Sequence, residues 1–188
     1  MFIVNTIFLE HSKNNMIEDA KIFSISDDQL LLEASSWHDG DYRVAIAFVI
    51  RTWGSSPRPV GSIMLVREDG QIAGSVSGGC VEGAVIDVAL ELIASGGSRR
   101  LDFGVADATA WEVGLSCGGE ISILVIAVEK GGFSPKLLSD TVSSLKSRAP
   151  IGLCIPINGG PVLAIEKPPE QSVLEANQFV FVQSARPQ

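Results

Sequence analysis

The chain has 188 residues, of which 46% are hydrophobic and 19% are charged, and its formal net charge at pH 7 is −8. This composition is typical of a soluble globular protein that is long enough to bury a core in one domain or slightly more. The negative charge argues against general nucleic-acid binding. The sequence contains no run of about 18 apolar residues, so we do not expect a membrane span. An anionic ligand would therefore need arginines or backbone amides gathered in one place.

Residues 1–26 are interpreted as an N-terminal extension that could be disordered. The apolar first residues lack the basic leading region and the small-residue cleavage site of a signal peptide. The three cysteines, Cys80, Cys117 and Cys154, are too widely spaced for a disulfide framework or a CxxC metal site. We therefore expect a cytoplasmic protein whose folded domain comprises residues 27–183.

Hydrophobic periodicity predicts an α+β fold in which about three helices pack on a mixed β-sheet. The segments with helical spacing are 27–37, 80–95 and 134–147, with a further helical turn at 107–113. The β-prone runs are 43–53, 62–67, 71–76, 99–103, 121–128, 151–157, 162–166 and 179–183. Turn-forming residues between several of these runs predict hairpins.

The longest β-prone run, Arg43–Trp53, is almost continuously apolar, as expected for a central strand that is buried on both faces. Arg51 lies near its end and Arg58 lies in the following loop, and an arginine can bind a phosphate through two parallel hydrogen bonds. Ser55 and Ser56 lie between the two arginines, so this loop is a polar cluster. The alternative is that both arginines are simply solvated.

A glycine-rich stretch, residues 74–83, opens the helix predicted at 80–95. Ser77 offers a capping hydroxyl, and the free amides at a helix N-terminus favour an anion. Cys80 lies on the first turn, where a thiolate would be stabilised, and Glu82 is expected to point away from the sheet. The apolar face that we expect to be almost completely buried is formed by Val81, Val85, Val88 and Leu92.

Two pairs of glycines adjoin cysteines, in Gly78-Gly79-Cys80 and in Cys117-Gly118-Gly119. Glycine lets the backbone approach a ligand closely, and successive amides can form an anion-binding nest. Neither pair lies in a P-loop, GxxxxGK[ST], or in a dinucleotide fingerprint, GxGxxG. The alternative is that both are tight turns with small buried cysteines, and burial is also what we expect for Cys154.

Three motifs in order, RTWGSSPRPVG at 51–61, GSVSGGCVE at 74–82 and GLSCGG at 114–119, resemble those of the XdhC/CoxI family. The resemblance extends from about residue 27 to about residue 128. Members of this family are accessory proteins that mature xanthine dehydrogenase, carbon-monoxide dehydrogenase and related molybdenum hydroxylases. The resemblance implies transient binding of molybdenum cofactor, a phosphorylated pterin that holds its metal through a dithiolene.

The resemblance also implies partners. A family member holds the cofactor while a cysteine desulfurase supplies its terminal sulfur, and then delivers it to the apo-molybdenum hydroxylase, without turnover of its own. Full-length members carry a second, Rossmann-like domain after a linker similar to residues 184–188. This chain therefore resembles the N-terminal domain only, with no Rossmann domain of its own, and a separate Rossmann-type partner could complete it.

Physical reasoning and the resemblance together assign roles within these motifs. The glycine amides before Cys80 would hold the phosphate or the molybdenum oxo groups, and Arg51 and Arg58 would neutralise further negative charge. Cys80, and after it Cys117, would contact the metal or carry sulfur, because a thiolate is a soft ligand; Cys80 is the candidate molybdenum ligand. The candidate cofactor-binding residues are Arg51, Ser55, Ser56, Arg58, Ser77, Gly78, Gly79, Cys80, Cys117, Gly118 and Gly119.

Two alternatives from other functional classes remain open. One is a sulfur-transfer enzyme that carries a persulfide on Cys80, and the other is a regulatory interaction subunit whose Gly-Cys turns are purely structural. For the chaperone, we expect the loop 54–61, the turn 77–82 and the segment 117–120 to converge on one cleft that both cysteine sulfurs face.

The apolar runs near the C-terminus, 151–157 and 179–183, have no obvious cover in the sequence. Uncovered apolar strands tend to be paired with another chain. We therefore expect a homodimer or a docking surface at these strands.

Overall fold

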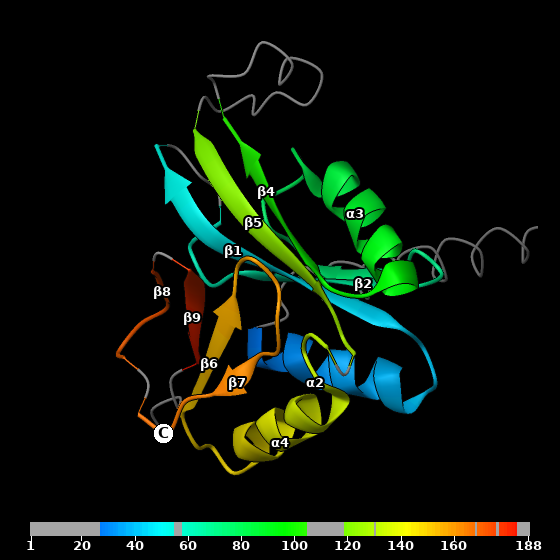
Figure 1. The fold of residues 1–188 in the computed structure, drawn as a ribbon, viewed down its shortest axis with the longest axis vertical. Coiled ribbons are helices and arrows are strands. Elements are labelled where there is room, and N and C mark those ends of the chain that lie inside the picture. Colours follow the sequence, from blue (N-terminus) through cyan, green and yellow to red (C-terminus); the bar gives the residue numbers. More distant parts are fainter. Residues whose placement is uncertain are drawn as a thin grey trace, which may run out of the picture.

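The computed structural model describes residues 27–54, 58–104, 119–129, 131–167, 169–175 and 177–183 (Figure 1). The expected N-terminal extension, the helical turn at 107–113 and the tail at 184–188 lie outside these ranges. Within the described ranges, no helix has the length and apolarity needed to cross a membrane.

A five-stranded sheet forms the centre of the fold, and its longest strand lies in the middle. Its strands are β1 (Val44–Trp53), β2 (Ile63–Arg67), β3 (Ile72–Gly74), β4 (Ser98–Phe103) and β5 (Glu120–Ala127). The strand order is β3-β2-β1-β5-β4, and each neighbouring pair is antiparallel. The central position predicted for the apolar run Arg43–Trp53 is confirmed.

A second sheet packs beside the first. Its strands are β6 (Ile151–Pro156), β7 (Leu163–Ala164), β8 (Val173–Leu174) and β9 (Gln178–Gln183), in the order β7-β6-β9-β8. The α+β class is confirmed, but the described strands form two antiparallel sheets where one mixed sheet was expected. The physical reason is that β1, β2 and β3, like β6 and β7, follow one another through short connections, which suit antiparallel pairing.

Within the described residues, three helices cover these sheets: α2 (Asp27–Asp39), α3 (Glu82–Ser95) and α4 (Pro135–Lys146). Figure 1 shows α3 on one face of the five-stranded sheet, with α2, α4 and the second sheet on the other side. Helix α4 lies within the predicted segment 134–147. The Ser134 hydroxyl caps it by accepting a hydrogen bond from the Leu137 amide at 3.2 Å, and Pro135 occupies the first helical position.

Strand β1 separates two hydrophobic cores. Ala45, Ala47 and Val49 face α3, and their small side chains let the helix lie close to the sheet. The alternate residues Ile46 and Phe48 face α2 and the second sheet. All five side chains are at most 1% exposed. The two-sided burial inferred from the apolar run is therefore confirmed.

The buried face of α3 differs at one position from the predicted one. Val81, Val85 and Leu92 are at most 4% exposed, as expected, but Val88 is only half-buried. Val88 lies at the edge of the buried face of α3, because the side of the helix that contacts the sheet is rotated slightly from the predicted one. Ala89, the next residue, is completely buried instead.

The expectation that the C-terminal apolar strands lack cover is wrong. Leu153 of β6 and Phe179 and Phe181 of β9 are at most 1% exposed. The Phe48 ring of β1 lies 5.3 Å from the ring centroid of Phe181 and 6.1 Å from that of Phe179. The second face of β1 thus covers these C-terminal strands. The reason for expecting a homodimer at these strands therefore no longer holds.

Replacement of Phe48 tests this packing. We expect Phe48→Ala to lower the free energy of unfolding by about 3–5 kcal/mol, because a fully buried ring between the two sheets leaves a cavity. Leu163→Ala is the control, since Leu163 is 58% exposed and its loss should change stability by less than about 0.5 kcal/mol. Denaturant unfolding measures both, and a loss below about 1 kcal/mol for Phe48→Ala would contradict the packing described.

Candidate functional site

The glycine-rich turn before α3 closes around a carboxylate of its own chain. Oε1 of Glu82 accepts hydrogen bonds from the amides of Ser77, at 2.9 Å, and of Gly78, at 3.2 Å. Oε2 accepts one from the amide of Gly79 at 2.9 Å. The hydroxyl of Ser75 donates to Oε1 at 2.7 Å, and that of Ser77 donates to Oε2. The predicted anion-binding nest exists, and Glu82 occupies it.

This network determines the charge of Glu82. Burial alone would raise the pKa of its carboxyl, but the hydrogen bonds from Ser77 and Ser75 outweigh burial and lower the pKa to about 2. Gly78 and Gly79 have φ angles of 79° and 118°, which favour glycine, so the turn needs both residues to present its amides.

The occupied nest bears on two sequence-based expectations. Glu82 was expected only to point away from the sheet, and its side chain folds back onto the amides of the turn before α3. The amides of Gly78 and Gly79 were expected to hold a phosphate or molybdenum oxo groups. In this structure they donate to Glu82, so an external anion would first have to displace that carboxylate.

The turn also fixes the position of Cys80. The Ser77 hydroxyl oxygen accepts hydrogen bonds from the amides of Cys80, at 2.9 Å, and Val81, at 3.0 Å. Ser77 therefore caps this turn, while α3 itself begins at Glu82, two residues later than predicted. Cys80 is half-buried and packs against the core under α3, and a Cβ added at Gly79 would meet no atom within 4 Å. The hydrogen bonds to Ser77 thus hold the backbone at Cys80 in place just before α3.

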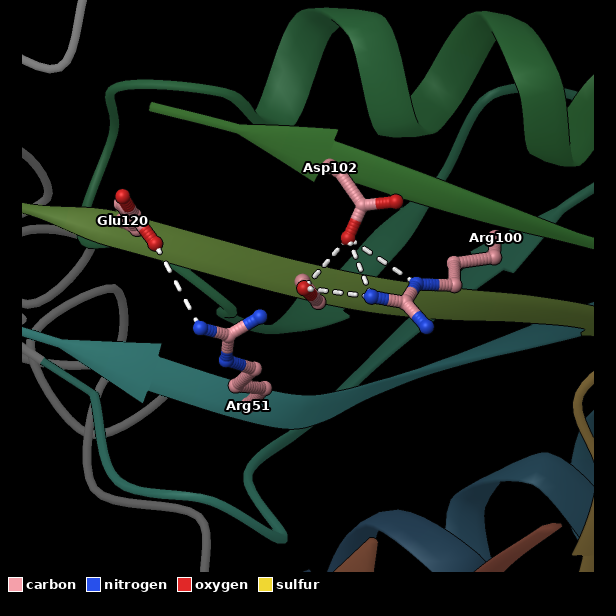
Figure 2. A network of polar contacts seen from close by, with 5 residues as sticks. Arg51, Arg100, Asp102 and Glu120 are labelled. Atoms are coloured by element: carbon pink, nitrogen blue, oxygen red, sulfur yellow. Dashed lines mark hydrogen bonds and ion pairs between the residues drawn. The ribbon is translucent and has the colours of Figure 1, made fainter. Parts of the chain in front are cut away.

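A second group of polar residues lies at the end of the five-stranded sheet (Figure 2). Arg51 of β1 forms an ion pair with Glu120 of β5 at 3.7 Å. On β4, the guanidinium of Arg100 binds Asp102 at 2.8 and 2.9 Å, and the Ser122 hydroxyl of β5 donates to the same carboxylate. Burial tends to raise the pKa of Asp102, but the hydrogen bonds from Arg100 and Ser122 and the charge of Arg100 lower it overall.

Arg51 and Cys80 lie at one end of the sheet but on opposite faces of it. Trp53 pairs with Glu120, and Figure 1 shows the end of β1, the start of β5 and the start of α3 at the same end. Arg51 pairs with Ser122, whose neighbour along the same face, Leu124, lies in the core opposite α3. Cys80 packs on the α3 side. The sheet therefore separates Arg51 from Cys80.

The other predicted site residues are distributed as follows. Arg58 is half-buried in the loop after β1, and Gly119 is buried immediately before β5. Ser55, Ser56, Cys117 and Gly118 lie outside the described residues, so the expected approach of the two cysteine sulfurs remains a prediction.

Sequence reasoning missed the residues that complete both sites. An acidic residue on the first turn of a helix that follows a glycine-rich run could have indicated Glu82, because such a carboxylate is attracted to free amides. Arg100, Asp102 and Ser122 give no comparable signal. They meet through the pairing of β4 with β5, which joins residues about 20 positions apart.

The fold and the turn define an α+β protein of two antiparallel sheets that presents a cysteine at the start of the helix covering its central strand. Residues 37–104 match the model of the XdhC and CoxI family. This match confirms the resemblance found in the motifs.

The relatives extend the comparison. The chain is 39% identical over 101 residues to "Molybdenum cofactor insertion chaperone PaoD" of Escherichia coli (strain K12), a match that covers 53% of this chain and 30% of PaoD. It is 32% identical over 109 residues to "Uncharacterized protein YqeB" of the same organism, covering 58% of this chain and 19% of YqeB. The chain thus spans less than a third of the length of either relative.

A solved structure shares the fold. A crystal structure of a xanthine dehydrogenase from Bacillus halodurans superposes with a TM-score of 0.58 and 24% sequence identity. The superposition covers 83% of this chain and 40% of that protein. At this identity the likeness shows a common fold.

The Glu82 network yields a prediction of pH-dependent stability. Because the pKa of Glu82 is lowered in the folded state from its ordinary 4.5 to about 2, its contribution is complete above about pH 4.5 and is lost as pH falls towards 2. We expect Glu82→Gln to lower the free energy of unfolding at pH 7 by about 1–2 kcal/mol, a value reduced for partial exposure to solvent.

The difference between parent and variant should shrink as the pH is lowered from 4.5 to 2, as measured by denaturant unfolding at several pH values. Glu91→Gln is the matched control on the same helix, because Glu91 forms an exposed ion pair with Arg99 and should contribute little. Equal stabilities of the Glu82 and Glu91 variants at pH 7 would contradict the role assigned to the nest.

Proposed function

We propose that the chain is a molybdenum-cofactor-binding accessory protein that presents Cys80 to the metal end of the cofactor. The observation that carries this proposal is the 39% identity to the chaperone PaoD over 101 residues. The structure adds a physical reason, since the motif that contains Cys80 folds into a turn held by hydrogen bonds to Glu82 and Ser77.

The residues at this turn fit the metal end of such a cofactor better than its phosphate end. The Cys80 thiol is half-buried, and its thiolate is a soft ligand that suits a sulfur-bound metal. The amides of Gly78 and Gly79 already neutralise one carboxylate, so a phosphate would compete with Glu82 there. When bound, the cofactor supplies a molybdenum centre whose terminal ligand can be exchanged.

The role of this chain's own residues is to position the cofactor. Glu82 holds the turn closed, and Ser77 orients the backbone at Cys80, so little conformational freedom is lost when a ligand arrives. Arg58, which is half-buried in the loop after β1, remains the candidate for neutralising further charge from the sequence-based set. These residues bind and orient, and the proposed role needs no turnover.

The finer steps follow from the family. We propose that the cofactor is held here in the cytoplasm while a cysteine desulfurase supplies the terminal sulfur, and that it then passes to an apo-molybdenum hydroxylase. A separate Rossmann-type domain could complete the cofactor site. A homodimer is not part of the proposal, because the strands that suggested it are buried within the chain.

Cys80 provides the most direct test in the chain itself. The parent protein, produced in cells that make the cofactor, should retain molybdenum and a fluorescent pterin after purification. We expect Cys80→Ser to lower the molybdenum bound per chain by about tenfold or more, because a metal ligand is lost. Metal analysis by mass spectrometry and fluorescence of the oxidised pterin measure the two components.

Cys154→Ser is the matched control. The Cys154 sulfur lies in β6 and donates a hydrogen bond to Gln178 at 2.8 Å, and burial raises the pKa of its thiol. This variant should retain as much cofactor as the parent. Equal retention by folded Cys80→Ser and parent would refute the proposed role of Cys80. Labelled sulfur recovered on Cys80 would instead favour the sulfur-transfer alternative.

A further inference from the structure

Strand β4 forms one edge of the five-stranded sheet. It pairs with β5 on one side, and within the described residues no strand pairs with its other side. The backbone groups of such an edge are a template on which a further strand can pair. β4 has six residues, whereas β3, at the opposite edge of the sheet, has three. β4 therefore offers the longer docking edge.

The outer strand β4 carries charges of both signs on one face. In the pairing with β5, Arg100 lies opposite Leu124 and Asp102 lies opposite Ser122, so both charged side chains project to the face away from α3. Their side chains are 31% and 59% exposed. Charged side chains usually protect an edge strand from pairing. A further strand is therefore accepted only where its charges are opposite to those of β4.

The ion pair between Arg100 and Asp102 leaves hydrogen-bonding groups unused. All the hydrogen bonds to Asp102, two from Arg100 and one from Ser122, go to Oδ1 (Figure 2). In the part of the chain that the structure describes, Oδ2 of Asp102 accepts no hydrogen bond and Nη1 of Arg100 donates none. One acceptor and one donor are thus available to an arginine and an aspartate of another strand.

Only one symmetric register that uses most of β4 matches these charges. Two copies of β4 can extend one sheet around a two-fold axis perpendicular to it, so that one residue of the strand lies opposite itself. If that residue is Arg99, Arg100 or Asp102, like charges face each other, which is destabilising. If it is Leu101, each Arg100 lies opposite Asp102 of the second copy. Two arginine–aspartate pairs then flank a leucine pair.

The same register suits the other face of β4. Leu101 and Phe103 project towards α3, and both are half-buried at the margin of the core. Phe103 would lie opposite Arg99 of the second copy, where a guanidinium can contact an aromatic ring. Val88, three residues before Glu91, lies on the side of α3 that Arg99 reaches, and it is also half-buried. A second copy would cover part of this apolar margin.

We propose that a second copy of this chain docks on the outer edge of β4, so that two five-stranded sheets join into one antiparallel sheet centred on Leu101. Each Arg100 then binds Asp102 of the other copy in addition to the aspartate of its own chain. The two α3 helices do not meet, because each lies over β1 and β5 and both β4 strands separate them. This edge is distinct from the covered C-terminal strands, and the proposal does not rest on the role assigned to Cys80.

Sedimentation velocity of the full chain over a range of concentrations tests the association. We expect a monomer–dimer equilibrium with at least half of the chain dimeric at about 100 μM, since an interface of one strand pair is small. Raised salt should weaken the dimer, because partly exposed charge pairs are screened. A chain that is still mostly monomeric at this concentration would overturn the proposal.

Charge reversal at the two opposed positions tests the register. Arg100→Asp places aspartates opposite each other, and Asp102→Arg does the same with arginines, so each variant alone should dimerise at least about tenfold more weakly than the parent. An equimolar mixture of the two variants should dimerise, because each aspartate then faces an arginine. The chain that carries both substitutions should dimerise alone. It keeps one charge of each sign within the strand, so it separates loss of docking from loss of folding.

Ile72→Lys is the matched control, because Ile72 is 42% exposed on β3, at the opposite edge of the same sheet. It should dimerise like the parent, and thermal unfolding checks that every variant is folded. If folded Arg100→Asp and Asp102→Arg dimerise like the parent, or if their mixture stays monomeric, the proposed edge or its register is refuted. Dissociation by Ile72→Lys would place the contact on β3 and would refute the proposal as well.

Discussion

The two-sided burial of β1 is the constraint on which the rest of this structure depends. Its apolar centre needs a helix on one face and a second layer on the other, and α3 and the C-terminal sheet supply them. This cover ends at the register shift between Val49 and Arg51, after which Arg51 and Trp53 are exposed. Polar side chains therefore cluster at the end of β1 that extends beyond the two hydrophobic cores. Helix α3 begins at this same end of the sheet.

The carboxylate of Glu82 explains why the glycine-rich turn is well defined without a ligand. Amides that converge on one point would be poorly satisfied in a partly buried turn, and an internal anion removes that problem. The same arrangement changes the meaning of the motif. The glycines shape the turn around Glu82, and in our proposal the group that contacts the cofactor is the Cys80 side chain.

Much of the fold could be predicted from local sequence patterns. The continuous apolar run indicated β1, and the helical spacing of residues 134–147 indicated α4. The C-terminal sheet was harder to place, because the cover of Phe179 and Phe181 is Phe48, which lies more than a hundred residues earlier. No local pattern reports such a contact.

The candidate site was predictable in its motifs and not in its contacts. Helical periodicity placed Glu82 on the solvent side of a helix that was expected to begin at Cys80. The helix begins only at Glu82, and the Glu82 side chain turns back onto the amides of the preceding turn. Arg51 and Cys80 belong to neighbouring motifs, yet strand alternation puts them on opposite faces. Glu120 and Asp102 acquire significance only once β5 lies between β1 and β4.

Anomalous diffraction at the molybdenum edge, from crystals of the protein purified with its cofactor, tests the central claim most directly. The account predicts one molybdenum peak within bonding distance of the Cys80 sulfur, with the Glu82 carboxylate still bound by the amides of Gly78 and Gly79. A peak at another position, or a phosphate in the nest in place of Glu82, would contradict it.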